Sequence, residues 1–451
     1  MIEVGQIKEV NIIDVNHMGQ GVSRIDDFVV FINNAIEGDI VEIEIIEVKK
    51  NFAKGKLLKI IKKSENRINA PCQYFSQCGG CQLMYIDYKA QLEYKKNRVL
   101  NELRRAFVNT EGVTINDTIG MEEPFRYRNK TAFSVIKKNN KIIVGPYEQG
   151  TYNTVNINSC MLQTKEADEV VSILKNLLIK YKVEPYDKRT RRGTIRNIVL
   201  RSNKQNEIML ILVTSSEIFP NKELIVKELT THVKEIKTVV QNINSRNTNL
   251  IMGYKNIVLF GDGTIKDTIG EFTFTISPDT FFQINQIQTE KLYEKAIEYA
   301  NLNKDDICFD IYCGIGTISL MVAKYVKKVY GVEIVEQSII NARENAKLNN
   351  IENAEFLSGK AEEVLPMLYK KSINADVIIV DPPRKGCEKE VIDSIISMAS
   401  KKVVYVSCNP STLSRDIKLL EDGGYKLKEV QPVDQFPWST HVETVCLLLR
   451  K

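Results

Sequence analysis

The sequence predicts an α/β protein with a mainly parallel sheet in its C-terminal part and a small β-barrel at its start. Three patterns support this prediction. From about Ile269 onward, short runs of β-branched residues alternate with helical patterns, which is typical of a parallel sheet. A glycine-containing turn, Gly314-Ile315-Gly316, follows the first of these runs. Over residues 1–60, short apolar runs are instead separated by turn signals alone, as in a barrel.

The composition indicates a globular protein and excludes several other classes. The chain has 451 residues, of which 43% are hydrophobic and 26% are charged, and no apolar run is long enough to span a bilayer. This length corresponds to about three domains, which we place at residues 1–60, 61–268 and 269–451. Nine cysteines without a basic-then-apolar export signal favour a reducing cytoplasm. The net charge is only +5, so a nucleic-acid surface requires local clusters of basic residues.

The N-terminal barrel is predicted to be of the OB type. Residues 28–32 and 40–45 are strand-like, and the second run alternates in part between apolar and polar residues. A lysine-rich tail follows, with Phe52 among its lysines. Such basic and aromatic surfaces bind single-stranded nucleic acid, although an ordinary solvated lysine face has the same composition. The lysines of the tail are Lys49, Lys50, Lys54, Lys56, Lys59, Lys62 and Lys63.

Three closely spaced cysteines indicate a metal or cluster site in the central domain, which we expect to be α+β. Cys72, Cys78 and Cys81 have the spacing Cys-x5-Cys-Gly-Gly-Cys, and the glycine pair lets the backbone wrap tightly round a bound group. Four thiolates favour zinc or a cubane iron–sulfur cluster. Cys160 is the only other cysteine before the C-terminal domain and is the candidate fourth ligand. The Cys-x3-Cys-x2-Cys spacing of radical enzymes is absent.

Two other stretches of the central domain are basic. Residues 86–107 have a helical pattern, and a contact of this helix with the C-terminal domain is left open. Residues 188–204 contain five arginines and no acidic residue, which indicates phosphate contacts unless the stretch is a disordered, solvated loop. The basic residues of the helix are Lys95, Lys96, Arg98, Arg104 and Arg105. The arginines of the second stretch are Arg189, Arg191, Arg192, Arg196 and Arg201.

The strands of the C-terminal domain are expected to bring distant residues together. The strand-like runs are 307–311, 328–332, 377–380 and 403–407. The residues at or just past their ends are Tyr312, Glu333, Asp381 and Cys408. Parallel strands end along one edge of a sheet, where ligands bind, so these side chains should converge. Glu333 follows Asp310 by 23 residues and can accept hydrogen bonds from a ribose, whereas an incomplete G-x-G-x-x-G pattern disfavours a dinucleotide.

Cys408 is a candidate nucleophile because it follows a buried strand and precedes Asn409-Pro410, which cannot extend the sheet. The alternative is that Cys408 is a small buried apolar residue, as most cysteines are. The chain closes with strand-like runs at 425–430 and 443–449, and the loop between them carries Trp438 and His441.

Five motifs resemble those of the RNA uracil-5-methyltransferase family. They begin at Phe281 (FFQIN), Asp310 (DIYCGIG), Asp381 (DPPRKG), Val406 (VSCNP) and His441 (HVETV). Residues 19–60 resemble a TRAM domain, and the two final strands resemble the antiparallel pair of class I methyltransferases. The resemblance covers nearly the whole chain and is greatest to the bacterial 23S rRNA members. It implies a Rossmann-like class I methyltransferase domain, cytoplasmic location and action as a monomer on 23S rRNA.

The same resemblance implies roles for individual residues. Gln283, Tyr312, Glu333 and Asp381 would contact S-adenosylmethionine, Cys408 would be the nucleophile and Glu443 the base. The four cysteines Cys72, Cys78, Cys81 and Cys160 would bind a [4Fe-4S] cluster. Thr317 stands where some members have Asn, which leaves a cofactor contact at that position unassigned.

Three other functions compete with a 23S rRNA uracil-5-methyltransferase. A tRNA uracil-5-methyltransferase would use the same chemistry. An amino-group methyltransferase would need no Cys408 and would usually carry an aromatic residue where Arg384 follows Asp381-Pro382-Pro383. A non-catalytic RNA-binding or assembly factor would use only the barrel and the basic stretches.

Overall fold

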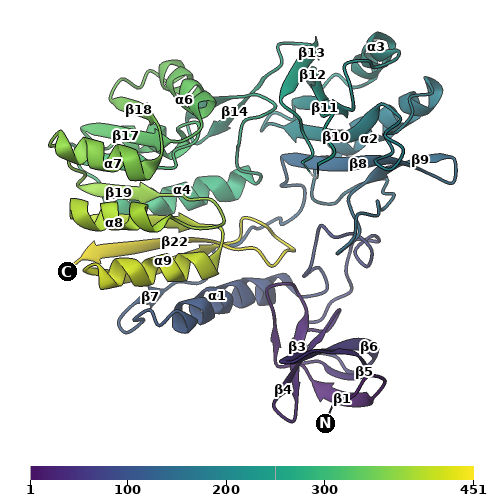
Figure 1. Cartoon of the computed structure of the whole chain (residues 1–451), viewed down its shortest axis with the longest axis horizontal. Helices are drawn as coiled ribbons and strands as arrows, with labels where there is room; N and C mark the ends of the chain where they lie inside the picture. Colours follow the sequence, from purple (N-terminus) through teal and green to yellow (C-terminus); the bar gives the residue numbers. More distant parts are fainter. Residues whose placement is uncertain (1, 249) are drawn as a thin grey trace.

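The structure is a computed structural model that describes residues 2–248 and 250–451. Figure 1 shows a small strand-rich unit formed by the start of the chain, a central α+β unit and a larger α/β unit formed by the end of the chain. No helix within the described residues is both long and apolar enough to cross a membrane.

The first unit is a six-stranded sheet with the order β1-β5-β6-β4-β3-β2, in which β1 also lies against β3. Alternate residues of β5 are buried because its side chains point in turn to the core and to water. Val30, Ile32, Val41, Ile43 and Ile45 fill this core. The strands are β1 Ile7–Asn11, β2 Asp14–Val15, β3 Gly21–Ile25, β4 Phe28–Ile32, β5 Ile40–Val48 and β6 Phe52–Lys62.

The central unit is a second six-stranded sheet with the order β13-β12-β11-β10-β8-β9. Every residue of β10 and β11 is buried, as expected for strands in the middle of a covered sheet. Helices α2 (Lys165–Lys180) and α3 (Lys222–His232) pack their apolar residues into the same core. The strands are β8 Lys130–Lys138, β9 Lys141–Gly145, β10 Ile195–Ser202, β11 Ile208–Thr214, β12 Ile236–Ile243 and β13 Lys255–Phe260.

The C-terminal unit contains an eight-stranded sheet with the order β18-β17-β16-β19-β20-β22-β21-β7. Its pairs are parallel except where β22 runs antiparallel to β20 and β21. The strands are β7 Thr114–Ile115, β16 Ile307–Ile311, β17 Lys328–Glu333, β18 Ala354–Ser358, β19 Val377–Val380, β20 Lys402–Ser407, β21 Tyr425–Val433 and β22 Glu443–Arg450.

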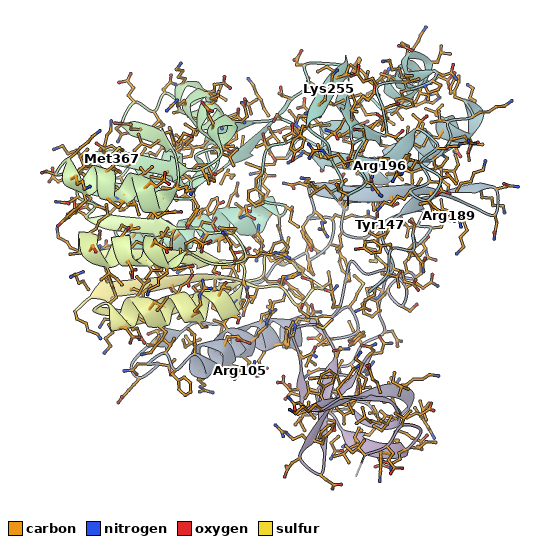
Figure 2. The ribbon with its side chains drawn as sticks, in the orientation of Figure 1. Arg105, Tyr147, Arg189, Arg196, Lys255 and Met367 are labelled. Atoms are coloured by element: carbon orange, nitrogen blue, oxygen red, sulfur yellow. The ribbon has the colours of Figure 1, made fainter. Side chains whose placement is uncertain are left out.

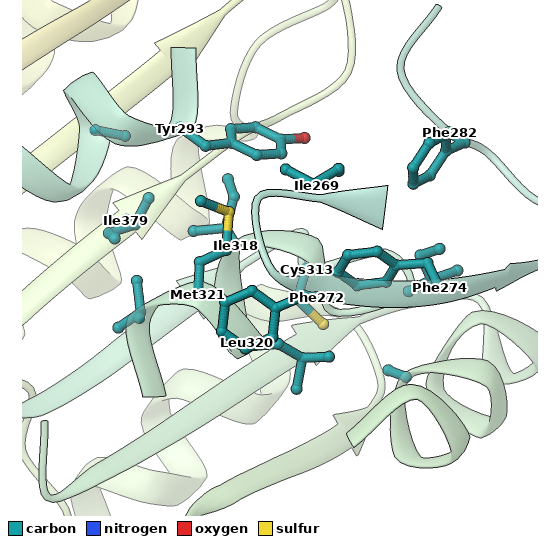
Figure 3. Packing of buried hydrophobic residues seen from close by; sticks show 14 of the residues in the cluster. Ile269, Phe272, Phe274, Phe282, Tyr293, Cys313, Ile318, Leu320, Met321 and Ile379 are labelled. Atoms are coloured by element: carbon teal, nitrogen blue, oxygen red, sulfur yellow. The ribbon is translucent and has the colours of Figure 1, made fainter. Parts of the chain in front are cut away.

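Helices cover this sheet, and the β14–β15 hairpin (Ile265–Ile269 and Phe272–Ile276) forms a separate two-stranded sheet on the side of this unit that faces the central one (Figure 1). One core joins residues of the hairpin, α4, α5 and β19 (Figure 3). A second core lies between the sheet and α7, α8 and α9. The helices are α4 Gln286–Ala300, α5 Thr317–Ala323, α6 Glu336–Leu348, α7 Ala361–Lys370, α8 Lys389–Met398 and α9 Pro410–Asp422.

Helix α1 (Tyr88–Arg105) is distant in sequence from the C-terminal unit but packs on it. Val99 and Leu103 are fully buried in the core formed with α9 and β21. Strand β7, which follows α1, pairs in parallel with β21 and completes the large sheet. The segment that leads out of the barrel therefore becomes part of the C-terminal unit before the chain enters the central one.

Candidate active site

Four of the predicted site residues lie together because the strands that carry them end side by side. Ile311 pairs with Val332 on one side and with Val380 on the other, so Tyr312, Glu333 and Asp381 leave the sheet at neighbouring positions. Tyr405 pairs with Val380, which brings the end of β20 and Cys408 next to Asp381. Sequence-distant residues thus share one sheet edge.

Glu443 reaches the same edge from the antiparallel strand β22. Ser407 is paired with Thr444, so Cys408 and Glu443 are neighbours across β20 and β22. Glu443 is only 3% exposed, whereas Cys408 remains partly accessible. A buried carboxyl group therefore lies beside an accessible thiol.

The turn that presents Cys408 is held by the residues around it. The Asn409 side chain caps α9 by accepting a hydrogen bond from the Ser411 backbone N–H, and Pro410 occupies the first turn of the helix, where it needs no hydrogen-bond donor. Asn409 Nδ2 also donates to the Arg384 carbonyl at 2.9 Å, and the Thr412 hydroxyl donates to the same carbonyl. The Arg384 loop and the Cys408 turn are thereby joined.

Burial and neighbouring acids raise the pKa values of Cys408, Glu443 and Asp381. Burial raises the pKa of Cys408 to about 12, assisted by Glu443 and Asp381 and opposed by Arg384. Burial also raises the pKa of Glu443 to about 8 and that of Asp381 to about 7, and each of these carboxyls is further raised by a neighbouring carboxylate. Arg384 is the cation that favours ionisation of both Cys408 and Glu443. In the free protein Cys408 is thus a thiol near two carboxyl groups that keep their protons to higher pH than an exposed carboxyl group does.

The turn after β16 has the chemistry that a cationic, hydroxyl-bearing ligand such as S-adenosylmethionine needs. Tyr312, Gly314 and Gly316 have positive φ angles of 70°, 54° and 84°, and a Cβ at Gly314 would meet nothing within 4 Å. Asp310 is fully buried, and its Oδ1 has no hydrogen-bond partner among the described residues, while Oδ2 accepts from Ser319. Glu333 is partly exposed and uses Oε1 to accept from the Val335 N–H. Carboxylate oxygens are therefore available for ammonium and hydroxyl donors.

Tyr293 on α4 is a residue of this site that sequence reasoning missed. Its side chain is 3% exposed, its hydroxyl accepts a hydrogen bond from the Thr317 hydroxyl at 3.5 Å, and the Gln283 side chain lies beside it. Burial raises the pKa of Tyr293, and Asp381 and Glu443 raise it further. Thr317, whose contact the sequence left unassigned, thus contacts the phenol of Tyr293. The sequence feature that could have indicated Tyr293 is its position on α4, a helix that begins just after the FFQIN motif.

Helix α1 holds the loop that leads into Glu443. Lys95 and Asp434 form an ion pair in which both side chains are 0% exposed, and the Tyr88 hydroxyl donates to Asp434 at 2.7 Å. Lys95 Nζ also donates to the Phe436 carbonyl at 3.0 Å, and Arg98 donates to the Thr440 carbonyl. Of the basic residues predicted for this helix, Lys95 is thus buried, because the helix packs with this face against the loop.

The other two thiols near the site are less accessible than Cys408, and His441 is half-buried. His441 packs its ring against Phe436 at 5.8 Å, and burial lowers its pKa to about 4, with Arg384 adding to the effect. Cys387 is 4% exposed and Cys446 is 0% exposed, so both thiols lie in the core. Among these, Cys408 is the thiol that a substrate could reach.

The four cysteines predicted as ligands line a single cavity of about 400 Å³ in the central unit. A Cβ at Gly80 would lie 3.4 Å from the Cys78 sulfur, and the Gly79 N–H donates to the Tyr147 carbonyl at 3.0 Å. Burial raises the pKa of Cys78 and Cys160, and neighbouring anionic groups raise both further. Within the described residues, no three His, Cys, Asp or Glu side chains have the arrangement of a metal site. The donor chemistry fits a thiolate-bound group, and the [4Fe-4S] cluster stays a prediction.

The arginine-rich stretch is only partly available for RNA. Arg189, Arg191 and Arg192 are exposed, but Arg201 is 4% exposed within β10 and donates to the carbonyls of Pro278 and Thr280. The prediction of phosphate contacts is therefore wrong for Arg201, because the strand turns its side chain toward the segment that carries Gln283. Arg196 is 6% exposed and likewise donates to backbone carbonyls.

Comparisons with known proteins agree with this arrangement. The model of the tRNA (uracil-5-)-methyltransferase family matches residues 87–451, and that of the TRAM domain matches residues 2–58. The chain is 46% identical over 444 residues to an uncharacterized RNA methyltransferase of Clostridium acetobutylicum, covering 98% of this chain and 96% of the relative. It is 44% identical over 448 residues to one of Halalkalibacterium halodurans, covering 99% and 98%.

A solved structure has the same fold over nearly the whole chain. The Pyrococcus abyssi tRNA (uracil-54, C5)-methyltransferase in complex with S-adenosyl-L-homocysteine superposes with a TM-score of 0.79 at 25% identity, covering 98% of this chain and 100% of the other. The expected methyltransferase fold and N-terminal TRAM domain are thereby confirmed. The chain belongs to the tRNA (uracil-5-)-methyltransferase family and is an S-adenosylmethionine-dependent RNA methyltransferase with an N-terminal TRAM domain.

Proposed function

We propose that this enzyme methylates C5 of a uridine in 23S rRNA, with Cys408 as the nucleophile and Glu443 as the base. The observation that carries the proposal is the pairing of β20 with β22, which sets an accessible thiol beside a buried carboxyl group. An amino-group methyltransferase has no use for this pair. A non-catalytic RNA-binding protein needs neither residue.

C5 of uracil is too weak a nucleophile to take a methyl group directly. Addition of the Cys408 thiolate to C6 forms an enolate, which makes C5 nucleophilic. The thiol must first lose its proton, and Arg384 is the cation that favours the thiolate. S-adenosylmethionine, when bound, supplies an electrophilic methyl group. The cofactor would be held by Tyr312, Glu333 and Asp381 at the strand ends and by Gln283. A uridine within folded RNA must leave its stack to reach Cys408.

Glu443 has the environment of a general base for the final step. After methylation, C5 carries both a methyl group and a proton, and Cys408 can leave C6 only when that proton is removed. A pKa of about 8 allows the carboxylate of Glu443 to take the proton near neutral pH. The C5–H electron pair then restores the C5–C6 double bond as the Cys408 sulfur departs.

A denaturing gel with RNA substrate separates the two roles. Cys408→Ala should give neither methylation nor a covalent protein–RNA band. Glu443→Gln should accumulate that band, because addition and methylation proceed while elimination stalls. Wild-type enzyme should form the same band with RNA that contains 5-fluorouridine, since fluorine cannot leave as a cation. An adduct in Cys408→Ala would refute the nucleophile assignment, and normal turnover by Glu443→Gln would refute the base assignment.

The second candidate substrate is a tRNA uridine. The 23S rRNA assignment draws on sequence resemblance, whereas the solved relative is described as acting on uracil 54 of tRNA. Purified enzyme should be incubated with labelled S-adenosylmethionine and with unmodified 23S rRNA or tRNA transcripts. Label in 5-methyluridine from 23S rRNA alone supports the first assignment, and label from tRNA alone replaces it with the second.

We further propose that Cys72, Cys78, Cys81 and Cys160 bind one [4Fe-4S] cluster. The support is their position around one cavity and the glycine pair that brings backbone close to the Cys78 sulfur. Anaerobically purified protein should be brown and contain about four irons per chain. Stoichiometric zinc without iron would replace the cluster with a structural zinc site.

A further inference from the structure

The central unit contains a second large cavity, of about 730 Å³, which is separate from the candidate active site. Its floor is formed by β8 and β10, where Ser134 and Asn197 are paired across the two strands. Its rim is formed by the loop at 184–193 and by the tyrosines Tyr147 and Tyr152. No lining residue belongs to the eight-stranded sheet that carries Cys408. Cavities of this size accommodate small organic ligands, including a single nucleotide.

Arg196 provides a buried positive charge in this cavity. The register of β10 against β11 shifts between Ile195 and Asn197, so Arg196 lies in a β-bulge, a feature that redirects a side chain. Its Nη1 donates to the carbonyls of Asn244 at 2.6 Å and Arg246 at 2.8 Å. Its guanidinium lies 4.7 Å from the ring centre of Tyr186, and Tyr147, which is labelled with Arg196 in Figure 2, lines the same cavity.

No carboxylate neutralises Arg196 among the residues that the structure describes. Burial lowers the pKa of Arg196, and its strongest titratable neighbours are the phenols of Tyr186 and Tyr147. A buried cation without an anionic partner is costly, and an anionic ligand relieves that cost. The position of this charge at a cavity wall therefore points to a phosphate group as the partner.

The acidic residues of the cavity already have cationic partners. Glu184 accepts from Lys137 at 3.0 Å, and Asp187 lies 4.0 Å from Arg189. Lys188 and Arg192 remain at the rim, and within the described chain neither has a carboxylate at ion-pair distance. The cavity thus has an excess of positive charge in addition to Arg196.

The rim of the cavity also offers aromatic surface. The rings of Tyr147 and Tyr152 lie 5.8 Å apart in an edge-to-face arrangement, and Lys188 Nζ lies 5.7 Å from the ring centre of Tyr152. The Tyr152 side chain is 70% exposed, so a large part of its aromatic ring faces the solvent. Aromatic rings beside basic side chains are the usual features that stack unpaired bases and bind their phosphates.

We propose that this cavity binds an unpaired nucleotide of the substrate RNA, at a position other than the uridine that is methylated. Arg196 and Arg192 bind the phosphate, and the base stacks on Tyr152 beside Tyr147. The inference rests on the proposed function only in that the bound nucleotide belongs to the RNA that the enzyme methylates. A single-stranded nucleotide fits better than a duplex, because the groups surround a concave site and do not line an extended face.

Photochemical crosslinking tests the cavity independently of catalysis. The probe is a single-stranded RNA of about ten nucleotides with 4-thiouridine, a length similar to known single-strand binding sites. Crosslinks should map to residues 147–152 or 184–193 and should persist in Cys408→Ala, which removes the proposed nucleophile but leaves the cavity intact. Crosslinks confined to the barrel and the active site would overturn the proposal, whether or not the enzyme methylates rRNA.

Substitutions then connect the cavity to the substrate. Tyr152→Ala should weaken binding of a 23S rRNA transcript by about 5- to 150-fold, the loss expected for one base–aromatic stack. Tyr254→Ala is the matched control, because Tyr254 is 77% exposed on the same unit, has Arg246 4.3 Å from its ring centre and lies outside the cavity. Unchanged affinity for S-adenosylmethionine would show that both variants are folded.

Abasic substitutions in the RNA identify the stacked base. At one position, loss of the base should weaken binding to wild-type enzyme but cause no further loss in Tyr152→Ala. Equal RNA binding by wild type, Tyr152→Ala and Tyr254→Ala would refute the site. Equal sensitivity of wild type and Tyr152→Ala at every abasic position would refute base stacking.

Discussion

Carboxyl groups at the edge of the catalytic sheet differ in their contact with water, and this difference agrees with the separate roles that we propose for them. Glu333 at the end of β17 is partly exposed, while Glu443 at the start of β22 is 3% exposed. A solvated carboxylate accepts hydrogen bonds from ligand hydroxyls with little desolvation cost. A buried carboxyl keeps its proton to higher pH and suits proton transfer.

Glu333→Ala should weaken binding of S-adenosylmethionine by about ten- to a hundredfold. The substitution removes charge-assisted acceptors for ribose hydroxyls, worth about 1.5–3 kcal/mol. Isothermal titration calorimetry measures the change directly. Glu336→Ala is the control, because Glu336 is exposed in the first turn of α6 and should not contact the cofactor. Wild-type affinity in Glu333→Ala would remove Glu333 from the site.

Glu443→Gln should stabilise the protein increasingly as the pH rises. Burial keeps the proton on Glu443 in the folded chain up to about pH 8, whereas the unfolded chain loses it near 4.5. The wild type therefore loses stability relative to its unfolded state as the pH rises through this window, and the amide does not. The gain should grow by at most about 1.4 kcal/mol per pH unit. Urea denaturation at several pH values measures it, and a pH-independent difference would contradict the assignment.

At the scale of elements, the loop between β21 and β22 connects the catalytic sheet with α1 and with the cysteine region. The backbone N–H groups of Gln82 and Leu83 donate to the Trp438 carbonyl, and the Trp438 indole donates to the Pro124 carbonyl at 2.7 Å. Trp438 packs in one apolar cluster with Met84, against which Cys81 also packs. The chain that follows the cysteines is therefore in direct contact with the loop that positions Glu443.

Lys95→Met should destabilise the protein by about 3–5 kcal/mol, because it leaves the Asp434 carboxylate buried without a partner. Lys96→Met is the matched control on the same helix. Lys96 pairs at 2.7 Å with Asp117, whose side chain is 96% exposed, so its loss should cost about 1 kcal/mol or less. The double variant Lys95→Met with Asp434→Leu should recover part of the loss. Equal denaturation midpoints for Lys95→Met and Lys96→Met would contradict a buried ion pair.

At the scale of the whole molecule, the TRAM domain is not a freely tethered module. Val15 and Ile36 of the barrel pack with Leu83, Tyr85 and Ile86 in one apolar cluster. The Tyr85 hydroxyl also donates to the Gly19 carbonyl at 2.9 Å. Deletion of residues 1–60 would expose this cluster, so surface substitutions are the better test of RNA binding.

A triple substitution of Lys56, Lys59 and Lys62 by Ser should weaken RNA binding and leave S-adenosylmethionine binding unchanged. These side chains are exposed on β6, away from the catalytic sheet. For every phosphate of a single strand that a lysine no longer neutralises, the slope of log K against log salt should fall by about 0.7. Filter binding at several salt concentrations measures this slope. An unchanged slope would show that this lysine face is only solvated.

The local sequence pattern was sufficient to predict the strands that carry the candidate site. The runs at 307–311 and 377–380 were predicted with the bounds observed for β16 and β19. The convergence of Tyr312, Glu333 and Asp381 also followed, because parallel strands necessarily end along one edge. The ranges predicted for β21 and for the helix at 86–107 differ from the observed bounds by a few residues at their ends. The exact end of a helix or strand depends on capping and on sheet pairing, which the local pattern does not show.

By itself, the sequence determined the α/β class, the methyltransferase resemblance and the convergence at the sheet edge, since these depend on residue type and on periodicity along the chain. Only the tertiary structure decided that Lys95 pairs with Asp434, that Arg201 is buried and that Arg196 faces a cavity. A basic side chain has the same sequence signature on a surface and in an interface. Whether it meets water, a carboxylate or a carbonyl depends on which distant element packs against it, and that packing is a property of the folded chain.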